Sequence, residues 1–160
     1  ELPTARMNLD LTKGTPTKLS AADVKELAKL GGIVVDDAQA KFEGKWTERR
    51  GIAHLGTGYH YASGAGNRAT FTFEVKDAGK YELRGYWEAH ENRSGNSVLT
   101  INRVGEKPVT LRLNQKVGVI DQANKLGKFS FAAGTHTLVL SSDGGKGNVH
   151  ADAFQLILAD

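Results

Sequence analysis

The sequence predicts an all-β protein, an antiparallel β-sandwich of the jelly-roll kind with one short N-terminal helix. Apolar and polar residues alternate along many short segments, which is the period of a half-buried strand. Turn-forming residues separate these segments at close intervals, and 19 of the 160 residues are glycine. No helix-length segment lies between the predicted strands, which disfavours a parallel α/β fold.

Residues 1–31 differ in pattern from the rest of the chain and are predicted to form a linker and a short helix. The helix is expected at 20–30, because Ser20 is a good N-terminal cap and Gly31 can adopt the left-handed conformation that ends a helix. Residues 32–160 are then expected to form the sandwich module.

From residue 32 onward the pattern changes to the two-residue period of strands. The predicted strands are 33–35, 69–75, 80–88, 98–104, 108–113, 126–131, 135–140 and 149–158. We expect 98–104 to pair with 108–113, and 126–131 to form a hairpin with 135–140 across the turn at 132–134. The first and last strands are expected to be neighbours.

Composition restricts the classes of partner. The chain has no cysteine, so disulfides and thiolate metal sites are excluded. Its net charge is only +3 and both signs are mixed along the sequence, which argues against nucleic-acid binding. No apolar run is long enough to cross a bilayer, so no membrane partner is expected. The sequence begins at Glu1 without a signal peptide, and we expect a piece of a longer, secreted or periplasmic protein.

Catalytic motifs are missing from the sequence. It contains no nucleophile elbow, no zinc-binding histidine pair of the helical type and no phosphate-binding loop. Glu88 and Glu91 are close in sequence, but carboxylates that follow a strand end are usually solvated. Because no set of groups fills the roles of a reaction, the chain is not expected to be an enzyme.

A series of short motifs, taken in order, resembles a known family. The motifs are GIVVDD (32–37), GKW (44–46), GTGYHY (56–61), ATFTF (69–73), AGKYEL (78–83), HENR (90–93), LGKFSF (126–131), AG (133–134) and VHADAFQL (149–156). Over 32–158 this order resembles the golvesin-like domain family, also described as similar to the carbohydrate-binding domain of xanthan lyase.

The resemblance implies a β-sandwich appended to bacterial secreted enzymes, among them polysaccharide lyases, and to some flavin-dependent oxidoreductases. A polysaccharide and a parent catalytic domain in the same chain are therefore the expected partners. One departure is visible. Many family members carry an acidic residue next to glutamine after the central hairpin, whereas residues 111–115 here are LRLNQ.

Candidate ligand-binding residues lie in two segments and one strand. Sugars stack on exposed aromatic rings bordered by polar groups. The aromatic candidates are Trp46, Tyr59, Tyr61, Tyr86 and Trp87, and the polar candidates are His60, His90, Asn92 and Arg93. From these we select Tyr59, His60, Tyr61, Trp87, His90, Asn92 and Arg93 as the ligand-binding set. Core packing of the aromatic residues and a buried polar network are the alternatives.

Three aspartates lie in the first and last strands. Asp36 and Asp152, with Asp37 beside them, would suit a hard cation such as calcium if the two strands are neighbours. Hydrogen bonding at strand ends is the alternative, since the sequence shows no loop with defined ligand spacing. No other cofactor is expected. His54, His136 and His150 have no partner spacing and are expected to be ordinary strand or surface residues.

Two functions remain open from the sequence. One is a non-catalytic polysaccharide-binding module of a larger secreted enzyme, which requires two aromatic rings exposed around a groove. The other is a structural or assembly module that packs on its parent enzyme without a ligand of its own, which would bury those rings or place them on a flat contact patch.

Overall fold

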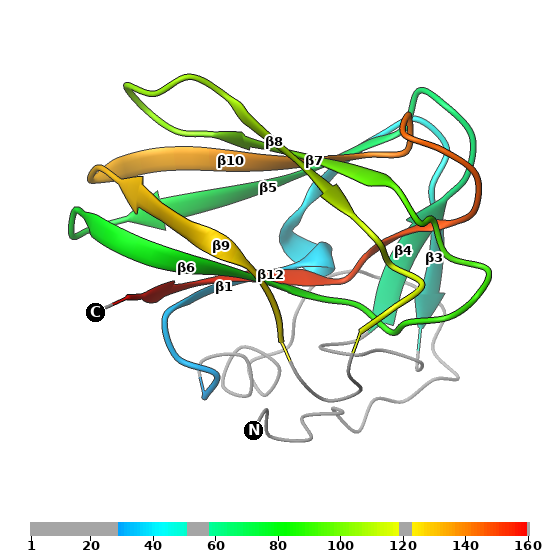
Figure 1. Cartoon of the computed structure of the whole chain (residues 1–160), viewed down its shortest axis with the longest axis horizontal. Helices are drawn as coiled ribbons and strands as arrows, with labels where there is room; N and C mark the ends of the chain where they lie inside the picture. Colours follow the sequence, from blue (N-terminus) through cyan, green and yellow to red (C-terminus); the bar gives the residue numbers. More distant parts are fainter. Residues whose placement is uncertain (1–28, 51–57, 119–122, 160) are drawn as a thin grey trace.

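The computed structural model describes residues 29–50, 58–118 and 123–159. Two antiparallel sheets face one another, and a smaller third sheet adjoins them at one end (Figure 1). The strands of the described residues are β1 (Ile33–Asp36), β2 (Lys41–Glu43), β3 (Thr47–Arg50), β4 (Gly58–Ala62), β5 (Arg68–Val75), β6 (Gly79–Tyr86), β7 (Ser97–Asn102), β8 (Val109–Leu113), β9 (Asn124–Phe131), β10 (Gly134–Ser141), β11 (Val149–Ala151) and β12 (Ala153–Leu158). A single 3₁₀ turn, η1 (Asp37–Gln39), follows β1.

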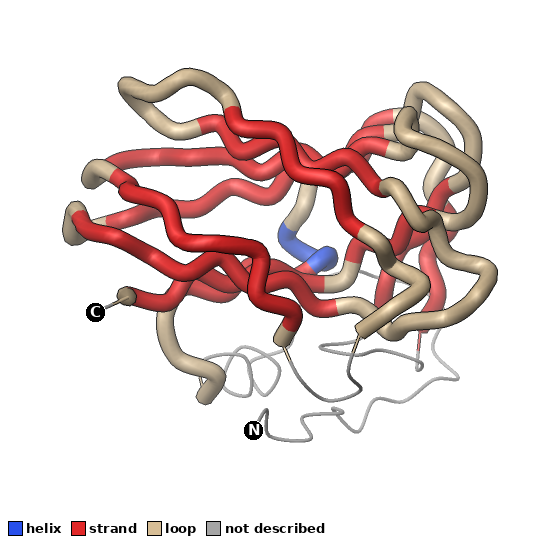
Figure 2. The backbone as a smooth tube through the Cα atoms, viewed as in Figure 1, coloured by secondary structure: helices blue, strands red, loops and turns tan. Residues whose placement is uncertain are grey.

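The strand order explains how the sandwich closes. One sheet has the order β1-β12-β6-β9, the facing sheet β2-β5-β10-β7-β8, and the third sheet β11-β4-β3. Consecutive strands therefore alternate between sheets, except for the β3–β4 and β7–β8 pairs. Loops cluster at the end of the sandwich beside the third sheet (Figure 2). The all-β sandwich that the sequence predicts is thus confirmed.

The core lies between the two large sheets. As the alternation predicts, Phe71, Phe73 and Val75 of β5 are buried, while the residues between them face outward. Phe71 meets Phe154 of β12 edge to face, with ring centroids 4.9 Å apart. This contact joins the five-stranded sheet to the four-stranded one, and burial of such rings is the dominant stabilising contribution.

One predicted hairpin and one predicted strand are wrong. Strands β9 and β10 flank the turn at 132–133, but they lie in different sheets, so this turn crosses the sandwich instead of closing a hairpin. The predicted last strand, 149–158, is two strands. The chain leaves the third sheet after β11, passes Asp152 and enters the four-stranded sheet as β12. Turn composition is similar in both kinds of connection, so the sequence pattern did not distinguish them.

Two predicted strand pairings are confirmed. β1 pairs with β12, with Ile33 opposite Leu156 and Asp36 opposite Ala153, which confirms that the first and last strands are neighbours. The pairing of β7 with β8 is also confirmed.

The helix expected at 20–30 lies almost entirely outside the described residues, as does most of the linker. Within the described part of the chain, no helix has the length and apolarity to cross a membrane.

Replacing Phe71 with alanine tests the joining role of this ring. We expect Phe71→Ala to lower the free energy of unfolding by about 3–5 kcal/mol, because it opens a cavity between the sheets. Thr72→Ala is the matched control on the exposed side of the same strand, with an expected change of about 0.5–1 kcal/mol. Urea unfolding followed by tryptophan fluorescence measures both. Equal losses in the two variants would contradict this account of the core.

Candidate functional site

Three buried aspartates meet where β1 ends and where β11 passes into β12. The Asp37 amide donates to the Asp152 carbonyl at 2.6 Å, which ties the two segments together. The Asp36 carboxylate accepts from the Ala38 amide at 3.0 Å, and the Gln39 side chain accepts from the Asp36 amide at 3.0 Å. This reciprocal pair is a capping box, and it fixes the first turn of η1. The local sequence Asp-Asp-Ala-Gln therefore holds two carboxylates at one strand end.

The carboxylates of Asp36, Asp37 and Asp152 come close enough to share an ion. One oxygen from each lies within 4.8 Å of the others, and all three residues are buried. Oδ1 of Asp37 has no hydrogen-bond partner among the described residues. Burial, together with the charge of Asp152, raises the pKa of Asp37 well above its usual value. Asp36 and Asp152 therefore lie close enough to share an ion, and the binding of an ion there stays a prediction.

The chemistry of this cluster fits a hard divalent cation. Calcium takes six to eight oxygen ligands, and carboxylate and carbonyl oxygens are its usual donors. The cluster offers only oxygen donors among its three members, and one of them is a buried carboxylate oxygen without a partner. A bound cation would also offset the repulsion among the carboxylates.

His60 belongs to the aspartate cluster and not to the ligand-binding set in which it was predicted. Its Nδ1 lies 2.7 Å from Oδ2 of Asp37, and its ring stacks on Phe42 with centroids 4.0 Å apart. Burial lowers the pKa of His60. Because side chains alternate along β4, His60 points away from the face that carries Tyr59 and Tyr61. The expected combination of His60 with Arg93 is therefore not formed.

Tyr59 and Tyr61 share the other face of β4, and both contact His150. The His150 ring stacks on Tyr59 at 4.4 Å and on Tyr61 at 5.8 Å between centroids. β11 places His150 there, because it pairs directly with Tyr61 across the third sheet. Tyr59 is only 8% exposed, whereas Tyr61 is half-buried. Of this stack, Tyr61 is the ring that reaches solvent.

Arg93 lies beside this stack but is itself buried, with 9% of its surface exposed. Its Nε donates to the Glu88 carbonyl at 3.2 Å, and its Nη1 donates to Oδ1 of Asn92. Its backbone forms an isolated bridge with Asn148, the residue before β11. Burial lowers the pKa of Arg93, while the nearby Tyr59 and Glu88 raise it. Arg93 thus shapes the 88–94 loop, in which His90 and Asn92 are exposed. The exposed edge of this loop, formed by these two residues, is called the rim.

Gln115 is a connecting residue that sequence reasoning missed. Its side chain accepts from the His150 amide at 2.9 Å and donates to the His150 carbonyl at 2.8 Å. It also accepts from the Ser97 hydroxyl at 2.9 Å. A lone glutamine after a strand carries no signal of such a role. His150 is a strand residue, as expected, but its place at the centre of the stack was also not foreseen.

Trp87 is not at the surface. It is 4% exposed, and its Nε1 donates to the Val117 carbonyl at 2.9 Å. Tyr86, on the opposite face of the same strand, is also buried and donates to the Gln155 side chain. Trp46 is half-buried against Phe42, on the His60 side of β4. No two of the five aromatic candidates are therefore exposed around one groove in the described part of the chain.

A family model confirms the resemblance seen in the motifs. The model of the Golvesin C-terminal domain matches residues 33–158, and the chain belongs to this family. Among curated protein sequences there is no match.

Several solved structures share the fold. Xanthan lyase from Paenibacillus is 30% identical with a TM-score of 0.71, covering 79% of this chain and 13% of the lyase. A Podospora anserina GH26-CBM35 β-(1,4)-mannanase is 16% identical with a TM-score of 0.61, covering 81% of this chain and 28% of the enzyme. The CBM35 of Cellvibrio japonicus Abf62 is 14% identical with a TM-score of 0.57, covering 81% and 95%. The chain thus corresponds to one part of each enzyme and to nearly all of the isolated module.

The buried His150 predicts a loss of stability in acid. Burial first, then the charges of Arg93 and His90, lower its pKa from 6.5 to about 3. Between these values the unfolded chain binds a proton that the folded state excludes. The free energy of unfolding should therefore fall by about 1.4 kcal/mol for each pH unit below about 6.5, and be unaffected by this group above that pH.

Urea unfolding from pH 8 to pH 4 checks this expectation. His150→Phe keeps an aromatic ring in the stack but cannot titrate, so its stability should fall less steeply below pH 6.5. Tyr61→Phe retains His150 and should keep the slope of the unchanged protein. Parallel slopes for the unchanged protein and His150→Phe would show that His150 does not carry the acid sensitivity.

Proposed function

We propose that this chain is a non-catalytic polysaccharide-binding module, appended to a larger secreted bacterial enzyme. Membership of the Golvesin C-terminal domain family supports it, and so does the fold shared with a CBM35 module and with parts of carbohydrate-active enzymes. The 13% coverage of xanthan lyase supports the appended role. The parent catalytic domain would then supply the reaction, and this module would hold the polymer near it.

The observation that carries the proposal is the convergence of polar and aromatic groups at one rim. The bridge between Arg93 and Asn148 brings the 88–94 loop against β11. His90 and Asn92 are exposed there, and the charge of His90 acts on His150, on which the half-buried ring of Tyr61 stacks. A sugar ring could stack against the tyrosine and accept or donate hydrogen bonds at the histidine and the amide. Such a shallow site gives modest affinity, because little surface is buried.

Arg93 acts in this proposal as a positioning residue. Its guanidinium binds the Asn92 side chain and the Glu88 carbonyl, and therefore holds the loop that presents His90 and Asn92. Lysine keeps the charge but cannot form both bonds in this geometry. Tyr59 is buried and stacks on His150, and through this contact it holds His150 in place next to the loop.

A structural or assembly role is the second candidate, and one observation favours it. Tyr59, Tyr86 and Trp87 are buried, which is the outcome that a module without a ligand predicts. In that case the module would pack on its parent enzyme and bind no glycan. The rim residues would then contribute to loop structure alone.

We also propose that Asp36, Asp37 and Asp152 hold a calcium ion with a structural role. The crowded carboxylates, and the unpartnered Oδ1 of Asp37, support this proposal. When bound, the cation would supply positive charge that lowers repulsion at the strand ends. Because the joint of β1, η1 and β12 contains all three residues, the ion would stabilise the fold without contacting the rim.

Changing the exposed rim residues tests the binding function. We expect the double variant His90→Ala/Asn92→Ala to bind a responsive polysaccharide about tenfold more weakly, through loss of one or two hydrogen bonds to the sugar. Its melting temperature should fall less than that of Arg93→Lys, because the bond from Arg93 to the Glu88 carbonyl remains. Affinity electrophoresis and calorimetry over acidic and neutral glycans measure the affinity. Glu106→Ala, in the distant turn after β7, is the control.

Arg93→Lys separates positioning from direct binding. A positioning role predicts weaker binding together with a melting temperature lower by several degrees, because buried hydrogen bonds worth about 1–3 kcal/mol are lost. Absence of binding to every glycan in the panel would favour the structural role instead.

Calcium should raise the melting temperature of the unchanged protein at pH 7. A hundredfold excess over the dissociation constant contributes about 2.7 kcal/mol, or several degrees. Without calcium, the raised pKa of Asp37 lets the folded state hold a proton that the unfolded chain has released. The contribution of this group to stability is therefore lost as the pH rises through its folded pKa. The gain from calcium should accordingly be larger at pH 7 than at pH 5.

Differential scanning fluorimetry with calcium or with a chelator measures this gain. Asp152→Asn should remove the dependence on calcium, whereas Asp143→Asn, at an exposed turn, should retain it. A melting temperature indifferent to calcium in the unchanged protein would leave strand-end hydrogen bonding as the role of these aspartates.

A further inference from the structure

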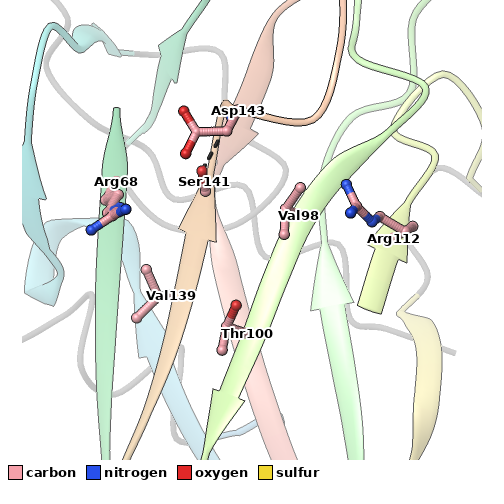
Figure 3. Close-up of a pocket in the computed structure, with 7 residues that line it drawn as sticks. All are labelled: Arg68, Val98, Thr100, Arg112, Val139, Ser141 and Asp143. Carbon is pink, nitrogen blue, oxygen red and sulfur yellow. Dashed lines mark hydrogen bonds between the residues drawn. The ribbon is translucent and has the colours of Figure 1, made fainter. Parts of the chain in front are cut away.

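A pocket opens on the outer face of the five-stranded sheet, away from the rim and from the aspartate cluster. It has a volume of about 440 Å³, within the range of small-ligand sites. Strands β5, β10, β7 and β8 and the turn after β10 supply its walls (Figure 3). The residues that line it are Arg68, Val98, Thr100, Arg112, Val139, Ser141 and Asp143.

The floor of the pocket alternates apolar and hydroxyl side chains. Ser141 pairs with Val98, and on the adjacent row Val139 pairs with Thr100. Each valine therefore has a hydroxyl side chain beside it on the neighbouring strand. Such a surface suits a ligand that carries both C–H faces and hydroxyl groups. The C–H faces would pack on the valine side chains, and the hydroxyl groups would hydrogen-bond to the serine and threonine hydroxyls.

Two arginines stand on opposite sides of this floor. Arg68 is in β5 and Arg112 is in β8, so their backbones are about 14 Å apart, or three strand spacings of about 4.8 Å. Figure 3 shows them at the two sides with Val139, Ser141, Val98 and Thr100 between them. Both side chains are exposed, and within the described ranges neither makes a direct hydrogen bond or salt bridge, although the charge of Arg68 acts on Asp143. Each guanidinium therefore has N–H groups available to bind a carboxylate in the bidentate mode, through two parallel hydrogen bonds.

One carboxylate lines the pocket and a second is the strand neighbour of Arg68, and both limit what the pocket can hold. Asp143 accepts from the Gly66 amide at 2.7 Å, and this bond lowers its pKa, so the carboxylate is already engaged. Glu43 of β2 lies opposite Arg68 in the sheet register, without an ion pair between them. Neither carboxylate favours an anionic group placed directly beside it. None of the lining residues is aromatic, so the pocket offers no ring on which a nucleic-acid base could stack.

The end wall of the pocket is held in place before any ligand arrives. The Asn96 side chain donates to the Gly144 carbonyl, and the Ser141 hydroxyl accepts from the Asp143 amide at 3.1 Å. A side chain at Gly144 would begin 2.1 Å from the Asn96 carbonyl and 3.2 Å from Nη1 of Arg112. Glycine therefore permits the turn to pack closely beside that arginine. Such preorganisation reduces the cost of binding.

We propose that this pocket is a second glycan-binding site, specific for an oligosaccharide that carries carboxylate groups, as uronic acids do. The two guanidinium groups bind carboxylates at either side, and the valine and hydroxyl floor receives the sugar rings between them. An acidic peptide would match the arginines but would leave the hydroxyl pattern of the floor unused. The site is independent of the rim, since no rim residue lines it.

Calorimetry with short oligogalacturonates tests the proposal, with their methyl esters as uncharged counterparts. The unchanged protein should bind the acid form at least about tenfold more tightly than the ester, and added salt should weaken only the former. Arg68→Gln/Arg112→Gln should lose this preference. Lys76→Gln/Lys107→Gln removes the same charge from exposed turns and should retain it. Chemical-shift changes on binding should include Val98, Thr100 and Val139.

Several results would overturn the proposal. These are equal binding of acid and ester, an effect of the lysine variant equal to that of the arginine variant, or no binding of the acid form. Tighter binding of a sulfated oligosaccharide or of a single-stranded oligonucleotide would assign the pocket to polyanions in general. His90→Ala/Asn92→Ala should bind oligogalacturonate normally, so failure of the rim and failure of this pocket are distinguished.

Discussion

The joint formed by Asp36, Asp37 and Asp152 is the constraint on which the rest of the structure depends. At this point the chain passes from the third sheet into the four-stranded sheet, and the Asp37 amide ties η1 to the Asp152 carbonyl. His60 extends the joint into β4 through its contact with Asp37. Three buried carboxylates so close together repel one another, so the joint is stable only if protons, hydrogen bonds or a cation offset that repulsion.

The joint also decides where the surfaces for ligands can lie. By fixing β4 and β11 relative to the sandwich, it places His150 near the loop that Arg93 organises, and the Tyr61 ring stacks on His150. Aromatic residues that could have served as sugar platforms support this arrangement from inside, as Tyr59 and Trp87 do. The exposed chemistry is therefore polar at the rim. On the outer face of the five-stranded sheet it is cationic and mixed with hydroxyl groups.

The candidate site could be predicted only in part. Tyr59 and Tyr61 share a face because side chains alternate along a strand, so their two-residue spacing alone indicates this arrangement. His60 was assigned to the same site from its position in the sequence, although alternation turns it toward Asp37. Gln115 and the pair Arg68 and Arg112 carried no local signal. Their roles arise from strands that are distant in sequence and adjacent in the sheets.

The sequence by itself determined the all-β class, the inward faces of strands such as β5, and the pairing of β7 with β8. Each of these depends on a local period or on a tight turn between partners. Only the tertiary structure decided which turns cross the sandwich. The turns after β5 and after β9 connect opposite sheets, although their sequences resemble those of hairpins. The physical reason is that a turn fixes the direction of the next strand, whereas its hydrogen-bonding partner is chosen by burial of apolar faces across the whole core.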